Sequence, residues 1–226
     1  MPNFNDPSPM LFTRFWVLCL LEGATRAGLA PAGRPQIFAL AYLANAVADV
    51  FHADAVQRAV LRSAAGPILS DVALELDRLT GLGLCNIARV SGTKKAAALK
   101  SQYYASAGAT SFLDEACARS SYLTSVREFH RLVANGFSDL GIPSIVDGSK
   151  AEASYSDLSV GLGEVVDLGE FEAAFPTLKA IAAVQRAMPE FRDRTAYSAI
   201  QIYGRYLSQT TSTSQQGAVH LEGSHS

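Results

Sequence analysis

The N-terminal half of the chain changes from helical to extended hydrophobic patterns. Apolar side chains cover most of the helix circumference in 10–28 and nearly all of it in 35–51, which predicts two largely buried helices. In 67–82 the apolar residues are spaced three, four and three apart, as in an amphipathic helix: Leu69, Val72, Leu76 and Leu79.

Two segments with a period of two follow the third helix, which ends in glycines. Residues 84–90 alternate, 91–95 form a turn, and 97–106 return as a second strand. A helix that ends at glycine and is followed by a hairpin has the order of a recognition helix and its wing. Residues 1–106 are therefore predicted to form a winged-helix domain with a β-hairpin wing.

Helical spacing dominates the second half of the chain. A short helix is expected over 111–118, and a longer one runs from a serine cap at 120 or 121 to residue 140. The longer helix has an apolar stripe: Tyr122, Val126, Phe129, Val133, Phe137 and Leu140. Residues 143–169 are expected to be a turn-rich connection with short extended pieces, followed by two helices over 171–188 and 192–207.

These patterns predict a mainly α (α+β) fold. The N-terminal winged helix occupies 1–106, and a helical domain with a Gly/Asp-rich connecting loop occupies 107–207. Residues 208–226 are rich in Ser, Thr, Gln and Gly, so a disordered tail is expected there.

Composition and charge narrow the classes of partner. Charged residues make up 18% of the chain, below the usual level of about a quarter, and the net charge is −2. A sparsely charged surface has two interpretations: a partner covers part of it, or the chain is a compact, alanine-rich helical protein. A net charge this small produces no overall field that attracts nucleic acid.

The cysteines and the absence of a leader pattern indicate the cytoplasm. Cys19, Cys85 and Cys117 lie in apolar or helical contexts without CxxC spacing, as expected of reduced, buried thiols. The apolar run at 15–21 is too short for a secretory leader or a membrane-spanning helix. We therefore expect a cytoplasmic protein without membrane contact.

No motif for catalysis, metal binding or cofactor binding is recognisable. Gly161-x-Gly163 lacks the Lys-Ser/Thr ending and the strand–helix context of a phosphate-binding loop. The acids around it match no calcium loop, although a metal site built from them, or an enzyme that uses 148–170, stays an alternative. We expect no enzyme activity, no catalytic residue, no metal and no cofactor.

Two acidic segments are candidates for protein contact. The predicted exposed face of 67–82 carries three acids and one arginine, which would repel the phosphates that supply most affinity for DNA. The Gly/Asp-rich segment after 155 carries further acids. We hypothesise that these segments dock on a basic partner surface through Asp71, Glu75, Asp157, Glu164 and Asp167.

The predicted hairpin is locally basic. It contains no acid between 86 and 105, and its cations are candidates for weak, salt-sensitive contact with nucleic acid: Arg89, Lys94, Lys95 and Lys100. Arg58 and Arg62, in a short helix predicted over 55–63, would extend the same side. The alternative is a solvated hairpin tip, where lysines discourage pairing of strand edges.

Three segments carry a likeness to a known family through their order and spacing. They are 37–48, then Gly66-Pro67 followed by 75–84, then 153–157 followed by Gly161 and 164–170. These segments resemble the middle components of bacterial ABC-three-component systems, the group that includes Lamassu-like antiphage defence. The alanine-rich C-terminal helices depart from the pattern of that family.

The resemblance implies a non-enzymatic adaptor subunit of an antiphage defence complex. Such a subunit would link an SMC/Rad50-like ABC ATPase, which senses DNA, to an effector. The alternative function is a winged-helix DNA-binding transcription regulator, against which the acidic residues of 67–82 count.

Overall fold

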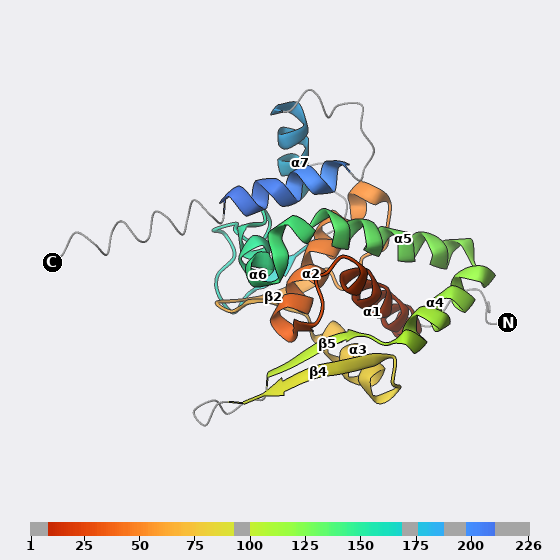
Figure 1. Cartoon of the computed structure of the whole chain (residues 1–226). Coiled ribbons are helices and arrows are strands. Elements are labelled where there is room, and N and C mark those ends of the chain that lie inside the picture. The colour runs from red at the N-terminus through yellow and green to blue at the C-terminus, as the bar shows by residue number, and fades with distance from the viewer. Residues whose placement is uncertain (1–8, 93–99, 169–175, 188–197, 211–226) are drawn as a thin grey trace.

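The computed structural model describes residues 9–92, 100–168, 176–187 and 198–210. Over these ranges the chain is mainly helical, with two small antiparallel sheets (Figure 1). The helices are α1 (Pro9–Arg26), α2 (Arg34–Val47), η1 (Ala48–Phe51), α3 (Ser70–Gly81), α4 (Ala107–Arg119), α5 (Ser121–Gly136), η2 (Ser138–Leu140), α6 (Gly141–Ala151), α7 (Pro176–Ala187) and a last helix over 198–210. The strands are β1 (Ala32–Gly33), β2 (Ala59–Ser63), β3 (Gly66–Ile68), β4 (Cys85–Ser91), β5 (Lys100–Ala105) and β6 (Val165–Asp167).

Helices α1 and α2 form the centre of the core, and the prediction of two buried helices is confirmed. Trp16 and Leu18 of α1 and Tyr42 and Leu43 of α2 are completely buried. Helix α1 packs on α5 and α3, while α2 packs on α6 (Figure 1). The contact of α1 with α5 needs a glycine, because a Cβ at Gly23 would lie 2.9 Å from a backbone oxygen of α5.

The first sheet confirms the predicted hairpin. Strands β4 and β5 pair in antiparallel register, with a bulge between Ile87 and Arg89. The short strand β1 pairs with the other edge of β5, so the strand order is β1-β5-β4. Helix α3 precedes the hairpin. Gly83, two residues after the end of α3, has a φ of +70°, a backbone conformation that favours glycine.

The second sheet, of order β3-β2-β6, replaces a predicted helix. The expected helix over 55–63 is wrong, because 59–63 is strand β2 and pairs with β3 and β6. The expected start of the third helix at residue 67 is also wrong: Gly66–Ile68 is β3, and α3 begins at Ser70. Pairing with β6, about a hundred positions further along the chain, outweighed the local helical spacing of two arginines.

The second half is more helical than its sequence suggests. Helix α5 begins after Ser120, whose side chain accepts the Leu123 N–H as predicted, and it ends at Gly136. The connection expected over 143–169 is wrong at its beginning, which is helix α6, whereas β6 in its last part agrees with the short extended pieces expected there. Residues 208–210 continue the last helix, so the prediction of a tail is wrong for these three; residues 211–226 lie outside the described ranges.

One hydrophobic core runs through both halves of the chain. It includes Trp16 and Leu76 from the first half, and Phe129 and Tyr203 from the second. The last helix crosses the end of α5 closely, because a Cβ at Gly204 would lie 2.6 Å from the Gly136 carbonyl oxygen. The core is therefore continuous across residue 106, where the sequence predicted a domain boundary.

Candidate interaction surfaces

Helix α3 presents a less acidic surface than its sequence suggests. Asp71 and Asp77 are exposed, but Glu75 is buried, so its expected exposure is wrong. Glu75 faces α1, where the Arg14 Nε donates to its carboxylate at 2.8 Å, and Arg78 of α3 donates to its other oxygen. Glu75 therefore joins two helices inside the protein and is not available to a partner.

The loop between α6 and β6 is held against strand β2. The Arg62 guanidinium donates to the carbonyl oxygens of Asp157, at 2.6 Å, and Val160, and its Cζ lies 5.5 Å from the centroid of the Tyr155 ring. The Tyr155 hydroxyl donates to the Ser63 carbonyl oxygen at 2.8 Å and accepts the Ser63 N–H. These contacts give the loop a defined shape beside β2.

The predicted acids of this loop are exposed, and two of them also shape it. The Asp157 carboxylate accepts the backbone N–H of Ser159 at 2.8 Å, and this hydrogen bond lowers the pKa of Asp157. Glu164 accepts the Gly161 N–H at 2.6 Å. Asp167 lies in β6, opposite Ala59 of β2.

The structure brings the two acidic segments to the same part of the molecule. The Asp71 N–H donates to the Gln57 side chain, whose amide donates to the Ala59 carbonyl oxygen. Ala59 is the cross-strand neighbour of Asp167. We call Asp71, Asp157, Glu164 and Asp167 the acidic surface.

A buried carboxylate, which the sequence did not indicate, lies beneath the loop. Glu152 is fully buried, and it accepts the hydroxyls of Tyr42 at 2.5 Å, Thr177 at 2.5 Å and Tyr203 at 3.0 Å. It also accepts the backbone N–H groups of Ser154 and Tyr155, near the start of the loop. Because Tyr42 is 110 positions from Glu152, no local pattern could have connected them.

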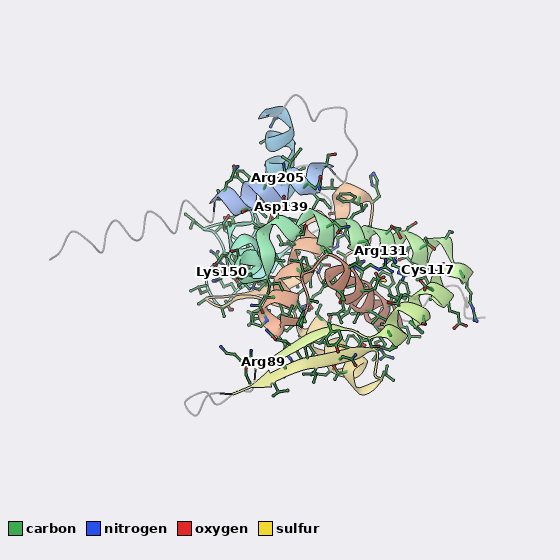
Figure 2. The ribbon with its side chains drawn as sticks, viewed as in Figure 1. Arg89, Cys117, Arg131, Asp139, Lys150 and Arg205 are labelled. Carbon is green, nitrogen blue, oxygen red and sulfur yellow. The ribbon has the colours of Figure 1, made fainter. Side chains whose placement is uncertain are left out.

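The basic residues of the hairpin border a groove of about 350 Å³. Arg89, Lys100 and Arg34 contribute to its lining, together with the first turn of α2. Arg89 extends from the hairpin in Figure 2. Gly33 provides no side-chain cap to α2, so the positive end of the helix dipole faces this region. Lys94 and Lys95 lie outside the described residues.

An acid reduces the positive charge of this groove. The Arg34 guanidinium pairs with Asp77 of α3, donates to the Tyr103 hydroxyl at 3.2 Å, and lies over the Tyr103 ring. Arg89 and Lys100 are the exposed groove cations that the sequence had suggested, while Arg34 was missed because it begins α2, far from the hairpin in the chain.

Within the described ranges, no cluster of three or more His, Cys, Asp or Glu side chains could hold a metal ion. Cys19 and Cys85 are buried, and burial raises the pKa of both thiols. None of the described helices is both long enough and apolar enough to cross a membrane.

The chain matched nothing when it was compared with protein-family models, curated proteins and solved structures.

Proposed function

We propose that the chain is a non-enzymatic adaptor subunit of a cytoplasmic bacterial antiphage defence complex. It would link an SMC/Rad50-like ABC ATPase to an effector, in the manner of the ABC-three-component, Lamassu-like systems that its sequence resembles. The observation that carries the proposal is the acidic surface. Within the described residues, 75–81 of the resembling segments belong to α3, and 153–168 belong to the loop beside β2 and to β6. Gln57 contacts Asp71 at the start of α3 and Ala59 of β2, and β2 pairs with β6.

We further propose that the N-terminal half is a winged helix. The element order is β1, α2, η1, β2, β3, α3, β4, β5. The sequence of α3 and the β4–β5 hairpin, together with the sheet order β1-β5-β4, supports this assignment, with α3 in the position of the recognition helix. The exposed acids Asp71 and Asp77 on α3 are unsuited to phosphate, so this helix would contact a protein.

Purification of the tagged full-length chain from its native host tests the adaptor function. We expect an ABC ATPase and an effector to co-purify in stable proportions. The double variant Asp71→Lys/Asp167→Lys should recover less of them, because charge pairs at an interface rim steer association and select partners. Glu115→Lys is the matched control, since Glu115 is an exposed acid on α4. Recovery of the chain without any ATPase would contradict the proposal.

The groove beside the hairpin favours a second candidate, the DNA-binding regulator. Arg34, Arg89 and Lys100 line a groove large enough for phosphate groups, next to the positive end of α2. Fluorescence anisotropy with duplex DNA at several salt concentrations separates the two candidates. The adaptor should bind weakly, with a salt dependence that disappears when Arg89, Lys94, Lys95 and Lys100 are changed to Gln. Tight, sequence-specific binding by the isolated chain would favour the regulator.

A further inference from the structure

The outer face of the second sheet exposes a row of apolar side chains. Leu61 in the central strand β2 is paired with Ile68 of β3 on one side and Val165 of β6 on the other. These side chains are 38%, 40% and 53% exposed. Their neighbours Val60 and Val166 point to the opposite face and are buried in the core. The sheet therefore has apolar residues on both faces, and the core covers only one of them.

The loop beside this sheet adds two more leucines. Leu158 is 94% exposed and Leu162 is 68% exposed. Their backbone is fixed, because Arg62 donates to the carbonyls on both sides of Leu158–Ser159, and the Gly163 N–H donates to the Arg62 carbonyl oxygen at 2.9 Å. A loop that holds leucines in water in a defined shape loses little conformational entropy when it binds a partner. We call Leu61, Ile68, Leu158, Leu162 and Val165 the apolar face.

We infer that the apolar face is the docking site for a second protein, which presents an apolar pocket bordered by lysines or arginines. The charge of the border supports this choice of partner. Residues 153–168 contain no lysine or arginine, and Asp157, Glu164 and Asp167 are exposed beside the leucines. Two cations lie nearby, and both have partners in the protein: the Arg62 guanidinium donates to loop carbonyls and lies over the Tyr155 ring, and the Arg58 guanidinium pairs with Asp49 and donates to the Leu168 carbonyl oxygen. An exposed apolar patch with a charged rim is typical of a protein interface.

The same acids argue against the other occupants of an apolar surface. In a symmetric dimer each copy would present its own acidic border to that of the other copy. An anionic membrane surface would repel the border, since it attracts basic segments. A basic protein surface is the partner that satisfies both the leucines and the acids.

Photo-crosslinking in the native host tests the docking site directly. The full chain is expressed with Leu158→benzoylphenylalanine, and a second version carries Phe112→benzoylphenylalanine on α4. Phe112 is also exposed, at 47%, and belongs to α4, which lies on the right of Figure 1, whereas α6 and β2 lie to its left. We expect adducts at position 158, but not at 112, with a peptide of a different protein that contains lysine or arginine near the crosslinked residue. Two outcomes would overturn the inference: adducts at position 158 only with a second copy of this chain, or no adduct at position 158 that is not also formed at position 112.

Two further variants separate the contribution of the leucines from that of the acids. Leu158→Ala/Leu162→Ala should reduce recovery of the crosslinked partner about tenfold, whereas Met10→Ala/Phe112→Ala should leave it unchanged. Asp157→Asn/Glu164→Gln keeps the side-chain acceptors for the Ser159 and Gly161 N–H groups and removes only charge. This variant should slow association about tenfold at low salt and flatten its salt dependence. Unchanged recovery by both loop variants would refute the docking site.

The inference rests on the proposed function only for the identity of the partner. A crosslinked ABC ATPase or effector supports both proposals. A crosslinked protein of another kind supports the docking site and counts against the adaptor function. Undiminished co-purification of both the ATPase and the effector with Leu158→Ala/Leu162→Ala supports the adaptor and overturns the docking site. Sedimentation of the chain with vesicles of phosphatidylcholine and phosphatidylglycerol tests for a membrane at this site. Vesicle binding that is lost in Leu158→Ala/Leu162→Ala would show that the apolar face binds a membrane, and would overturn the inference of a protein partner.

Discussion

Two buried glutamates show different ways of joining distant parts of this chain. Glu22 of α1 is surrounded by cations: Arg131 donates to both of its oxygens, at 3.0 and 3.2 Å, and Arg127 donates at 3.1 Å. Glu152 at the end of α6 is held, among the described residues, by neutral hydroxyls and backbone N–H groups. Each carboxylate connects elements that are far apart in the sequence.

The difference lies in what remains when one partner is removed. Without Glu22, the buried Arg127 would keep a single acid, Asp114, and would lie near Arg131, another cation. Without one donor, Glu152 would still be held by the others. Burial raises the pKa of Tyr42 and of Tyr203, and Glu152 adds to this, so both hydroxyls stay protonated donors. The Glu22 junction therefore depends on charge balance, and the Glu152 junction on the positions of dipoles.

The largest expected effect is that of Glu22→Gln. It should lower the free energy of unfolding by about 3–5 kcal/mol, because it leaves a buried arginine with too little compensating charge. Urea unfolding followed by circular dichroism measures the change. The control is Glu128→Gln: Glu128 is 54% exposed and pairs with the same Arg131, so its loss should cost about 0.5 kcal/mol or less. Equal effects of the two variants would show that the Glu22 junction does not depend on charge.

Lowering the pH should weaken the α1–α5 contact through His130. This ring is fully buried against Trp16, and burial lowers its pKa to about 4. The unfolded chain, with a His pKa of about 6.5, binds this proton more readily, so stability is complete above pH ~6.5 and falls by about 3 kcal/mol towards pH ~4. Unfolding measured at several pH values should show this loss.

Two controls assign the pH dependence to its groups. His130→Leu should remove the loss between pH ~6.5 and ~4, since leucine does not titrate. Glu22 acts at lower pH: although burial opposes it, hydrogen bonds from Arg131 and Arg127 lower its pKa. Its contribution is therefore present above its unfolded pKa and is lost as the pH falls below it. A loss near pH 6 that persists in His130→Leu would contradict the assignment to His130.

At the other junction, Tyr42→Phe should have a moderate and local effect. The change removes one hydrogen bond to a buried carboxylate, which should cost about 1.5–3 kcal/mol. Hydrogen exchange should become faster at the backbone amides of 154–168 and stay unchanged in α1 and α5. Tyr122→Phe is the control, because that side chain is 47% exposed. Faster exchange throughout the protein would show that Glu152 supports the whole core.

The smallest effect is expected for Arg26→Gln. Arg26 also pairs with Glu22, but its side chain is 54% exposed, so water screens the pair and the change should cost about 0.5 kcal/mol or less. The same urea unfolding measures it beside Arg127→Gln, in which a nearly buried partner of Glu22 is lost. Similar costs for the two arginines would mean that burial does not decide the strength of this network.

Elements whose formation depends on neighbouring residues were predictable from the amino-acid sequence. Helices α1, α2 and α3 follow from apolar spacing, and the hairpin from a period of two after a glycine-ended helix. The exposure of Asp71 was also predicted correctly, while the role of Asp71, Asp157, Glu164 and Asp167 as partner contacts stays a prediction. These features were accessible because periodicity, turns and helix ends depend on a few consecutive residues.

Which of these elements contact one another was not predictable from the sequence and follows from the packing of the whole chain. The helix predicted over β2 was wrong, because the pairing of β2 with β6 spans about a hundred positions and no local pattern contains it. The predicted exposure of Glu75 was wrong, because its partner Arg14 belongs to another helix. The apolar face likewise arises from the cross-strand register that places Leu61 beside Ile68 and Val165, and the residues next to Leu61 in the sequence do not predict this register. Burial and pairing between distant segments follow from the packing of the whole chain, so the candidate docking site emerged from the fold.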